Sequence, residues 1–343
     1  MSLIRGHYVS GSMMRCRNPG LVAASAAVVL FFSSSQDAAA FSCEMSGWAM
    51  DVGQIDPTST VPLDNSGRIQ IRCRDGNPGD TVLLCPAIGA LHSTHDKSAR
   101  KMIPLSGAGS EERFVAYNLF TDAARTRVWT HPAWGAPGDV PSVRAHIRED
   151  GTAEAEFGIH SRVWPNTHSG HSGMYRGSTV PGSGDQQLFF DINSSSDQCS
   201  YTSSSTGGGE IEVLGTVIDS CTITGSDAVD FGRRGVGSGI VEAQGNISVR
   251  CTEATDFSVS LGGGAQNNIL DRRMSKGSDM ISYQLYTDPG RSSIFGDGVR
   301  GSQRAGTGMN AADVNVPVYG LADLSKNPPA GEYSDRVIIT VTY

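Results

Sequence analysis

The fold is decided by the stretch Gly331-Glu332-Tyr333-Ser334-Asp335-Arg336-Val337-Ile338-Ile339-Thr340-Val341-Thr342-Tyr343. After its Gly and Asp turn signals, every second residue falls on one apolar face, namely Val337, Ile339, Val341 and Tyr343. This period of two predicts a β-strand. A strand rich in β-branched residues pairs within a sheet, and the sequence holds no later residue that could pair on its far side. We therefore expect a sheet edge that is either blunted or covered by another chain.

The same pattern occurs twice in the chain. Cys43 and Cys73 are separated by the same interval as Cys221 and Cys251, and the second cysteine ends an alternating run each time. Downstream, Tyr117 to Asp122 is answered by Tyr283 to Asp288, and at the same offset Trp129 is answered by Phe295. One module has been used twice.

The 343 residues exceed the usual size of a single domain, which agrees with this repeat. Residues 202–209 are rich in Ser, Gly and Thr, which is typical of a linker between a first domain at 41–201 and a second at 210–343. Short alternating runs separated by Gly, Pro, Asn and Asp, without a helical period, predict an all-β chain of two β-sandwiches.

Residues 1–40 have the features of a targeting segment. Arg5, Arg15 and Arg17 precede a largely apolar run at 21–32, and Ala38-Ala39-Ala40 offers a cleavage site. The run is shorter than the roughly 20 residues that a membrane-spanning helix needs. We expect an exported, soluble mature chain. The net charge of the full sequence is −8 and it contains no Lys/Arg run, which argues against nucleic acid or an anionic membrane as partner.

The cysteines predict disulfides. Removal of the targeting segment removes Cys16 and leaves an even set, as is typical of exported proteins, and no pair has the short spacing of a zinc site. The repeated interval pairs Cys43 with Cys73 and Cys221 with Cys251, each bridge contributing roughly 3.5 kcal/mol in the chain-entropy model. Cys85 and Cys199 are then left for each other.

The second copy resembles the spore coat protein U domain. The resemblance rests on an ordered set of motifs that covers residues 210–343: Phe231-Gly232, Arg272-Arg273-Met274, Tyr283-x-Leu285-Tyr286-Thr287-Asp288, Phe295-Gly296-Asp297-Gly298 and Gly331-x-Tyr333-x-Asp335. The first copy is similar more loosely, because Val52-Gly53 replaces Phe-Gly and Thr130-His131 replaces Gly-Asp after the aromatic residue.

The resemblance implies a subunit of archaic chaperone–usher pili. In that family the pilin is an immunoglobulin-like sandwich that lacks its last strand, which a periplasmic chaperone and then an adjacent pilin supply. An outer-membrane usher is the further assembly partner, and two-domain members are similar to tip adhesins at the cell surface. The implied donor-strand groove runs beside Val337, Ile339, Val341 and Tyr343. Here Cys43 follows the predicted cleavage site closely, so we expect a chain that accepts a strand and has too short an N-terminus to donate one.

The candidates for contact with a host or abiotic surface lie in the first copy. Its Pro-containing loops are expected at Leu83 to Leu91, Trp129 to Pro141 and Val163 to Asn166, and they carry the apolar candidates Ile88, Leu91, Trp129, Trp134 and Trp164. The alternative for each tryptophan is a place in the core of its own sandwich.

No catalytic motif is present in the sequence: it has no Gly-x-Ser-x-Gly, no His-Glu-x-x-His and no phosphate loop. We therefore expect a non-enzymatic adhesin that mediates attachment and biofilm formation and needs no cofactor or metal. Two other classes stay open: a structural minor pilin or coat-type protein without receptor binding, and a carbohydrate-processing enzyme built on a β-sandwich.

Overall fold

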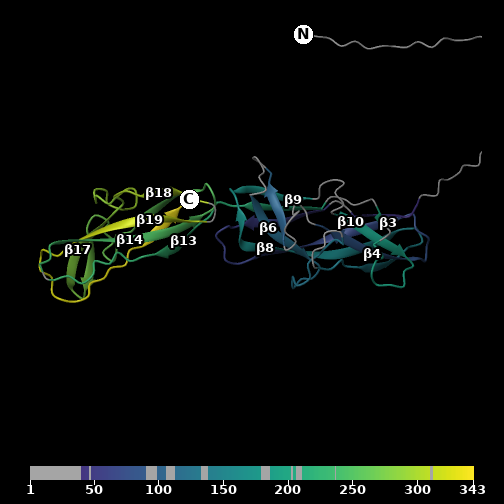
Figure 1. Cartoon of the computed structure of the whole chain (residues 1–343), viewed down its shortest axis with the longest axis horizontal. Helices are drawn as coiled ribbons and strands as arrows, with labels where there is room; N and C mark the ends of the chain where they lie inside the picture. Colours follow the sequence, from purple (N-terminus) through teal and green to yellow (C-terminus); the bar gives the residue numbers. More distant parts are fainter. Residues whose placement is uncertain are drawn as a thin grey trace, which may run out of the picture. The chain divides into compact units, whose positions relative to one another are not determined.

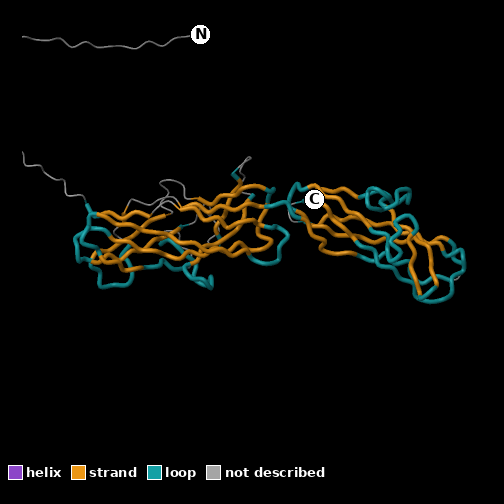
Figure 2. Tube along the Cα trace, turned by 180° about the vertical axis from the view of Figure 1, so that it is seen from behind, coloured by secondary structure: helices purple, strands orange, loops and turns teal. Residues whose placement is uncertain are grey.

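The structure is a computed structural model that describes residues 40–45, 48–89, 99–105, 113–132, 138–178, 186–201, 204–205, 211–235, 237–309 and 312–343. Residues 1–39, most of the predicted targeting segment, lie outside this range. Strands and loops make up the described residues, without a helix (Figure 2). Accordingly, no helix in this part of the chain has the length and apolar character to cross a membrane. The predicted all-β class is confirmed.

The first sandwich consists of two sheets whose apolar residues share one core. The larger sheet has the strand order β1-β3-β8-β6-β5-β9-β12-β2. Its strands are β1 (Ser42–Met45), β2 (Trp48–Ile55), β3 (Leu63–Arg74), β5 (Arg100–Pro104), β6 (Phe114–Phe120), β8 (Ala153–Ser169), β9 (Gly173–Ser178) and β12 (Ile211–Val217). The smaller sheet has the order β11-β10-β4-β7. It contains β4 (Thr81–Ile88), β7 (Val143–His146), β10 (Gln186–Ile192) and β11 (Ser204–Ser205).

Two of the expected loops are strands. The run from Leu83 forms part of β4, because its side chains are buried on both faces and fit a fully covered strand better than a loop. The segment from Val163 to Asn166 lies within β8. There the pairing of β8 with β6 shifts register, and Pro165, which has no N–H to donate, falls inside this irregularity.

The strand β12 joins the first sandwich, although sequence analysis assigns it to the second domain. It pairs parallel to β2 and antiparallel to β9, so both of its edges are hydrogen-bonded. The predicted linker at 202–209 precedes β12, whereas the chain passes from the first sandwich to the second only after Val217.

The second sandwich has sheets of five and three strands, in the orders β13-β14-β19-β17-β16 and β18-β15-β20. The strands are β13 (Cys221–Ser226), β14 (Ile240–Cys251), β15 (Asp256–Leu261), β16 (Arg272–Lys276), β17 (Asp279–Tyr286), β18 (Arg304–Thr307), β19 (Asp313–Asp323) and β20 (Ile339–Thr342). Figure 1 shows β13, β14, β17, β18 and β19 in one body and β3, β4, β6, β8, β9 and β10 in another. Two sandwiches, as predicted, make up the described chain.

The three predicted disulfides are confirmed. Cys43 lies opposite Cys73 across β1 and β3, and Cys221 lies opposite Cys251 across β13 and β14. The third bridge joins Cys85 of β4 to Cys199, with Cα atoms 6.2 Å apart.

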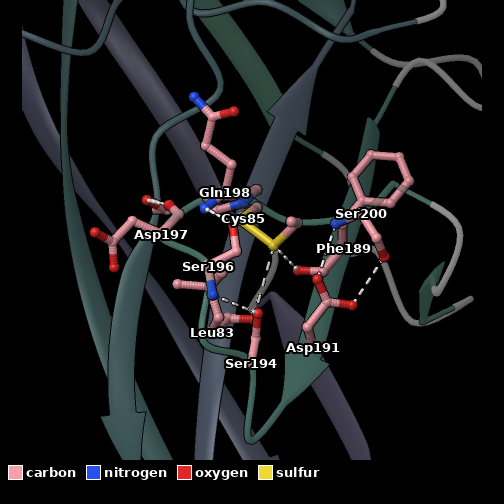
Figure 3. Close-up of a disulfide and its surroundings, with 12 residues drawn as sticks. Leu83, Cys85, Phe189, Asp191, Ser194, Ser196, Asp197, Gln198 and Ser200 are labelled. Carbon is pink, nitrogen blue, oxygen red and sulfur yellow. Dashed lines mark hydrogen bonds between the residues drawn. A yellow bond between two sulfur atoms is a disulfide. The ribbon is translucent and has the colours of Figure 1, made fainter.

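The Cys85–Cys199 bridge fastens the segment after β10 to the smaller sheet of the first sandwich (Figure 3). Beside it, the Ser200 backbone N–H donates to Asp191 Oδ2 at 2.8 Å and the Ser200 hydroxyl donates to Asp191 Oδ1 at 3.0 Å. Leu83, Phe189 and both sulfur atoms form a small core of their own. The bridge thus holds the segment after β10 against the smaller sheet, ahead of β11 and β12.

Candidate functional site: an open groove in the second sandwich

A groove of about 1250 Å³ opens into the core of the second sandwich. One wall is the segment 226–235 that follows β13, and the other is the segment 328–339 that leads into β20. Its floor is apolar and comes from both sheets: Ile247, Leu261, Ile281, Leu285, Val318 and Ala322. A gap between two sheet edges that reaches core side chains has the shape left by a missing strand.

The groove has an open sheet edge beside it. Among the described residues, β20 pairs with β15 alone, so its other edge has no strand partner. The half-buried Val337 and Ile339 line the groove, and Ile338 between them is 72% exposed on the opposite face. Val337 and Ile339, which the alternation in the sequence assigns to one apolar face, therefore both face the groove.

A hydrogen bond between Tyr283 of β17 and Asp335 joins the 328–339 wall to the floor of the groove. The Tyr283 hydroxyl donates to Asp335 Oδ2 at 2.5 Å, and Asp335 Oδ1 accepts from the backbone N–H of Ala265 at 2.8 Å. Burial raises the pKa of Tyr283, and the hydrogen bond to Asp335 raises it further. The phenol is therefore a neutral donor that holds the segment before β20 in position.

The first sandwich contains the same groove walls. Gly53 donates its backbone N–H to Asp51 Oδ1 at 2.8 Å, and Gly232 donates to Asp230 Oδ1 at the same distance. Both glycines have positive φ angles, +90° and +69°, which favour Gly. The stretch around Gly53 in β2 therefore corresponds to the 226–235 wall.

The second wall also has a counterpart. The Tyr175 hydroxyl donates to the backbone carbonyl of His171, four residues before it, at 3.0 Å. In the second sandwich the Tyr333 hydroxyl donates to the carbonyl of Pro329, also four residues before it, at 2.9 Å. Strand β9 therefore corresponds to the wall around Tyr333.

A buried arginine sits at the same place in each module. Arg100 donates to the carbonyls of Ile88 and Trp129 and to the Asn118 side chain. Burial lowers the pKa of Arg100 to about 10.

Arg272 makes the corresponding bonds in the second sandwich. It donates to the carbonyls of Leu261 and Phe295 and, at 2.5 Å, to Gln284 Oε1. In the sequence, the counterpart of Arg272-Arg273-Met274 is Arg100-Lys101-Met102, and this shared Arg-basic-Met pattern is the signal from which Arg100 could be found.

The two modules differ in what lies between the walls. In the first, β12 fills the space between β2 and β9, and Tyr175 is only 2% exposed. In the second, the space between the corresponding walls is the open groove, and Tyr333 remains half-buried. The open groove therefore lies beside the wall around Tyr333, as β12 lies beside β9 in the first module.

The remaining groove candidates, Val341 and Tyr343, are not among the residues that line the groove. Val341 pairs with Val259 across β15 and packs on the core. Tyr343 is 59% exposed. The groove continues instead along Pro328 to Tyr333, which sequence analysis did not assign to it.

The surface-contact candidates have separate positions. Ile88 and Trp129 were expected to contact a target, but both are fully buried, and Trp129 Nε1 donates to the carbonyl of Pro86 at 2.8 Å. These two belong to the core of the first sandwich because β4 is covered on both faces. Trp164 is half-buried on β8, with its ring 6.5 Å from that of Phe120. Leu91 and Trp134 lie outside the described residues.

Within the described part of the chain, no three His, Cys, Asp or Glu side chains gather as metal ligands.

Comparison with known proteins gives one match to a family and weaker likenesses to individual proteins. The profile of the Spore Coat Protein U domain matches residues 29–179 and 209–340. Protein U of Myxococcus xanthus is 31% identical over 111 residues, which cover 29% of this chain and 59% of that protein.

Two solved structures are similar to this chain at low identity. One is the CsuC-CsuE chaperone–tip adhesion subunit complex of archaic chaperone-usher Csu pili from Acinetobacter baumannii, with 15% identity, coverage of 88% of this chain and 100% of that chain, and a TM-score of 0.48. The other is the CupB6 tip adhesin from Pseudomonas aeruginosa, with 10% identity, coverage of 88% and 94%, and a TM-score of 0.28. The family profile matches both modules and most of the chain, so this protein belongs to the Spore Coat Protein U domain family.

Proposed function

We propose that this protein is a subunit of an archaic chaperone–usher pilus whose second sandwich accepts a donor strand. The observation that carries the proposal is the open groove, whose counterpart in the first sandwich is filled by β12. A periplasmic chaperone would supply the strand first and an adjacent pilin afterwards, with an outer-membrane usher as the site of exchange.

The groove suits an extended peptide with alternating apolar side chains. Its floor offers aliphatic residues of both sheets, while the free edge of β20 offers unpaired backbone groups to a new strand. Four inward side chains of such a strand would bury enough apolar surface for roughly 6–12 kcal/mol. A strand of this kind binds through its backbone and is selected by its side chains.

Within the pilus we assign this chain to the tip, as an adhesin at the cell surface that supports attachment and biofilm formation. The support is that the groove proposed as the acceptor lies in the second module. The loops between the strands of the first module are then available for contact with a surface. Trp164, together with Leu91 and Trp134, remains our proposal for the contact with a host or abiotic surface.

Two experiments test this function. The mature chain is produced alone, with its candidate periplasmic chaperone, and with a synthetic peptide of a co-expressed pilin's N-terminal extension. We expect a stable soluble monomer only with one of the two strand sources, whereas a stable monomer without either contradicts the acceptor role.

The second experiment locates the tagged protein on fibres by negative-stain microscopy. Label at fibre tips supports the adhesin, label along shafts supports a structural minor pilin, and fibres without label contradict a pilus subunit. The contact residues are tested by replacing Leu91, Trp134 and Trp164 with Ser. Lost adhesion with an unchanged melting temperature supports them, and equal loss of both properties makes them core residues.

A further inference from the structure

We infer that β12, residues 211–217, is a donor strand that the chain supplies to its own first sandwich. The family profile matches in two blocks, and its second block begins at residue 209. By sequence, residues 211–217 are thus the N-terminal extension of the second module. By pairing, they are a strand of the first, between β2 and β9.

The side chains of β12 are those of a strand that fills a groove. Ile211 and Val213 are fully buried, Val217 is 1% exposed, and all three belong to the first core. The alternate residue Thr216 is exposed. Apolar anchors at every second position are what an incomplete sandwich takes from an added strand.

Gly215 fixes the register of this strand. A Cβ atom at this position would lie 2.7 Å from Ile55 Cδ1 and 2.8 Å from Val52 Cγ2, both in β2. The pairing with β2 shifts register at the same point, between Leu214 and Thr216. A slip by one residue would bring a side chain against these methyl groups, which would then have to move, so the observed register is the one that avoids this clash.

The inference has a consequence for assembly, which rests on the function proposed above. A pilin of this kind gives its N-terminal extension to a neighbour, but here the extension of the second module is already used within the same chain. The protein therefore has one filled and one open groove, and it joins a fibre as an acceptor through its second sandwich. The strand pairing itself does not depend on that function.

The experiment cuts the full-length protein beside β12. A protease recognition sequence is inserted between Gly207 and Gly208. The bridges Cys43–Cys73 and Cys85–Cys199 lie before the cut and Cys221–Cys251 lies after it, so no disulfide joins the two fragments. We expect the fragments to elute together under native conditions and to separate in denaturant, because β12 remains seated in the first sandwich. Fragments that separate natively while the first sandwich melts as before the cut overturn the inference.

Two controls make the result specific. In the cut protein, Val213→Asp places a charge in the core and should release the fragments, whereas Thr216→Asp on the exposed face should leave them together. Moving the cut to between Ile218 and Asp219 leaves β12 attached to the first sandwich, and the fragments should then separate. If fragments cut at 207 stay together with Val213→Asp, another surface joins them and the inference is wrong. None of these measurements involves strand binding by the open groove, so a failure here leaves the proposed function standing, and the reverse also holds.

Discussion

The neighbouring residues Ile338 and Ile339 offer a matched test of the open groove. Ile339 is half-buried and lines the groove, while Ile338 is 72% exposed and points away from it. Complete burial of an isoleucine side chain contributes roughly 1.5–3 kcal/mol. Ile339 is partly buried already, and a donor strand in the groove would bury the rest of its side chain. We estimate the contribution of this remaining part as about 1–2 kcal/mol.

Ile339→Ser should therefore weaken binding of a donor strand about 5- to 30-fold, since about 1.4 kcal/mol corresponds to a factor of ten. Ile338→Ser removes the same atoms from a surface that the strand does not touch, and its effect should stay below about twofold. The assay is fluorescence anisotropy with a labelled peptide of a co-expressed pilin's N-terminal extension, at equal concentrations of each variant. Thermal melting of both variants serves as the control for folding. Equal weakening by the two substitutions, or none by Ile339→Ser, would refute the assignment of the groove as the acceptor.

Three further predictions concern the groups that hold each module together. Arg100→Met removes the donor to the carbonyls of Ile88, Gly89 and Trp129 and to one side-chain amide, so the first sandwich should lose at least about 3 kcal/mol of unfolding free energy in denaturant titrations, while melting of the second sandwich stays unchanged. Because the pKa of Tyr283 is raised in the folded protein, its contribution to stability is complete below about pH 10, the unfolded value, and is lost as the pH rises above it. Tyr283→Phe should remove that alkaline loss from the melting of the second sandwich above about pH 10, and a variant that still loses stability there as the parent does would contradict this cause. Replacing Cys85 and Cys199 together by Ser opens a loop with a sequence separation of 114 and should destabilise the first sandwich alone by roughly 5 kcal/mol, which calorimetry of the intact chain can check.

Local patterns account for much of what the sequence predicted correctly. The alternation of Val337, Ile339 and Val341 identified a strand and its inward face, and the structure keeps that face while limiting the strand to Ile339–Thr342. The equal cysteine intervals identified two bridges, because each interval joins facing positions on adjacent strands.

Several predictions that depend on long-range packing were wrong. Trp129 and Ile88 stand in Pro-containing stretches typical of loops, yet both are core residues, because β4 is covered on both faces and Arg100 ties their carbonyls together. Pro165 likewise suggested a loop, whereas a shift in register accommodates it within β8. A single sequence does not reveal such irregularities, because the partner strand creates them.

The sequence by itself determined that the chain is all-β, that one module is used twice, and that Cys43 pairs with Cys73 and Cys221 with Cys251, since each of these follows from spacing along the chain. Only the tertiary structure decided which module receives residues 211–217 and which of the two grooves is left open. The alternation of Ile211, Val213 and Val217 specifies a strand with one apolar face, and the backbone hydrogen bonds of a strand are alike for every edge it might join. The choice between edges depends on packing contacts such as that of Gly215 with Ile55 and Val52, residues that are distant in sequence and meet only in the folded chain.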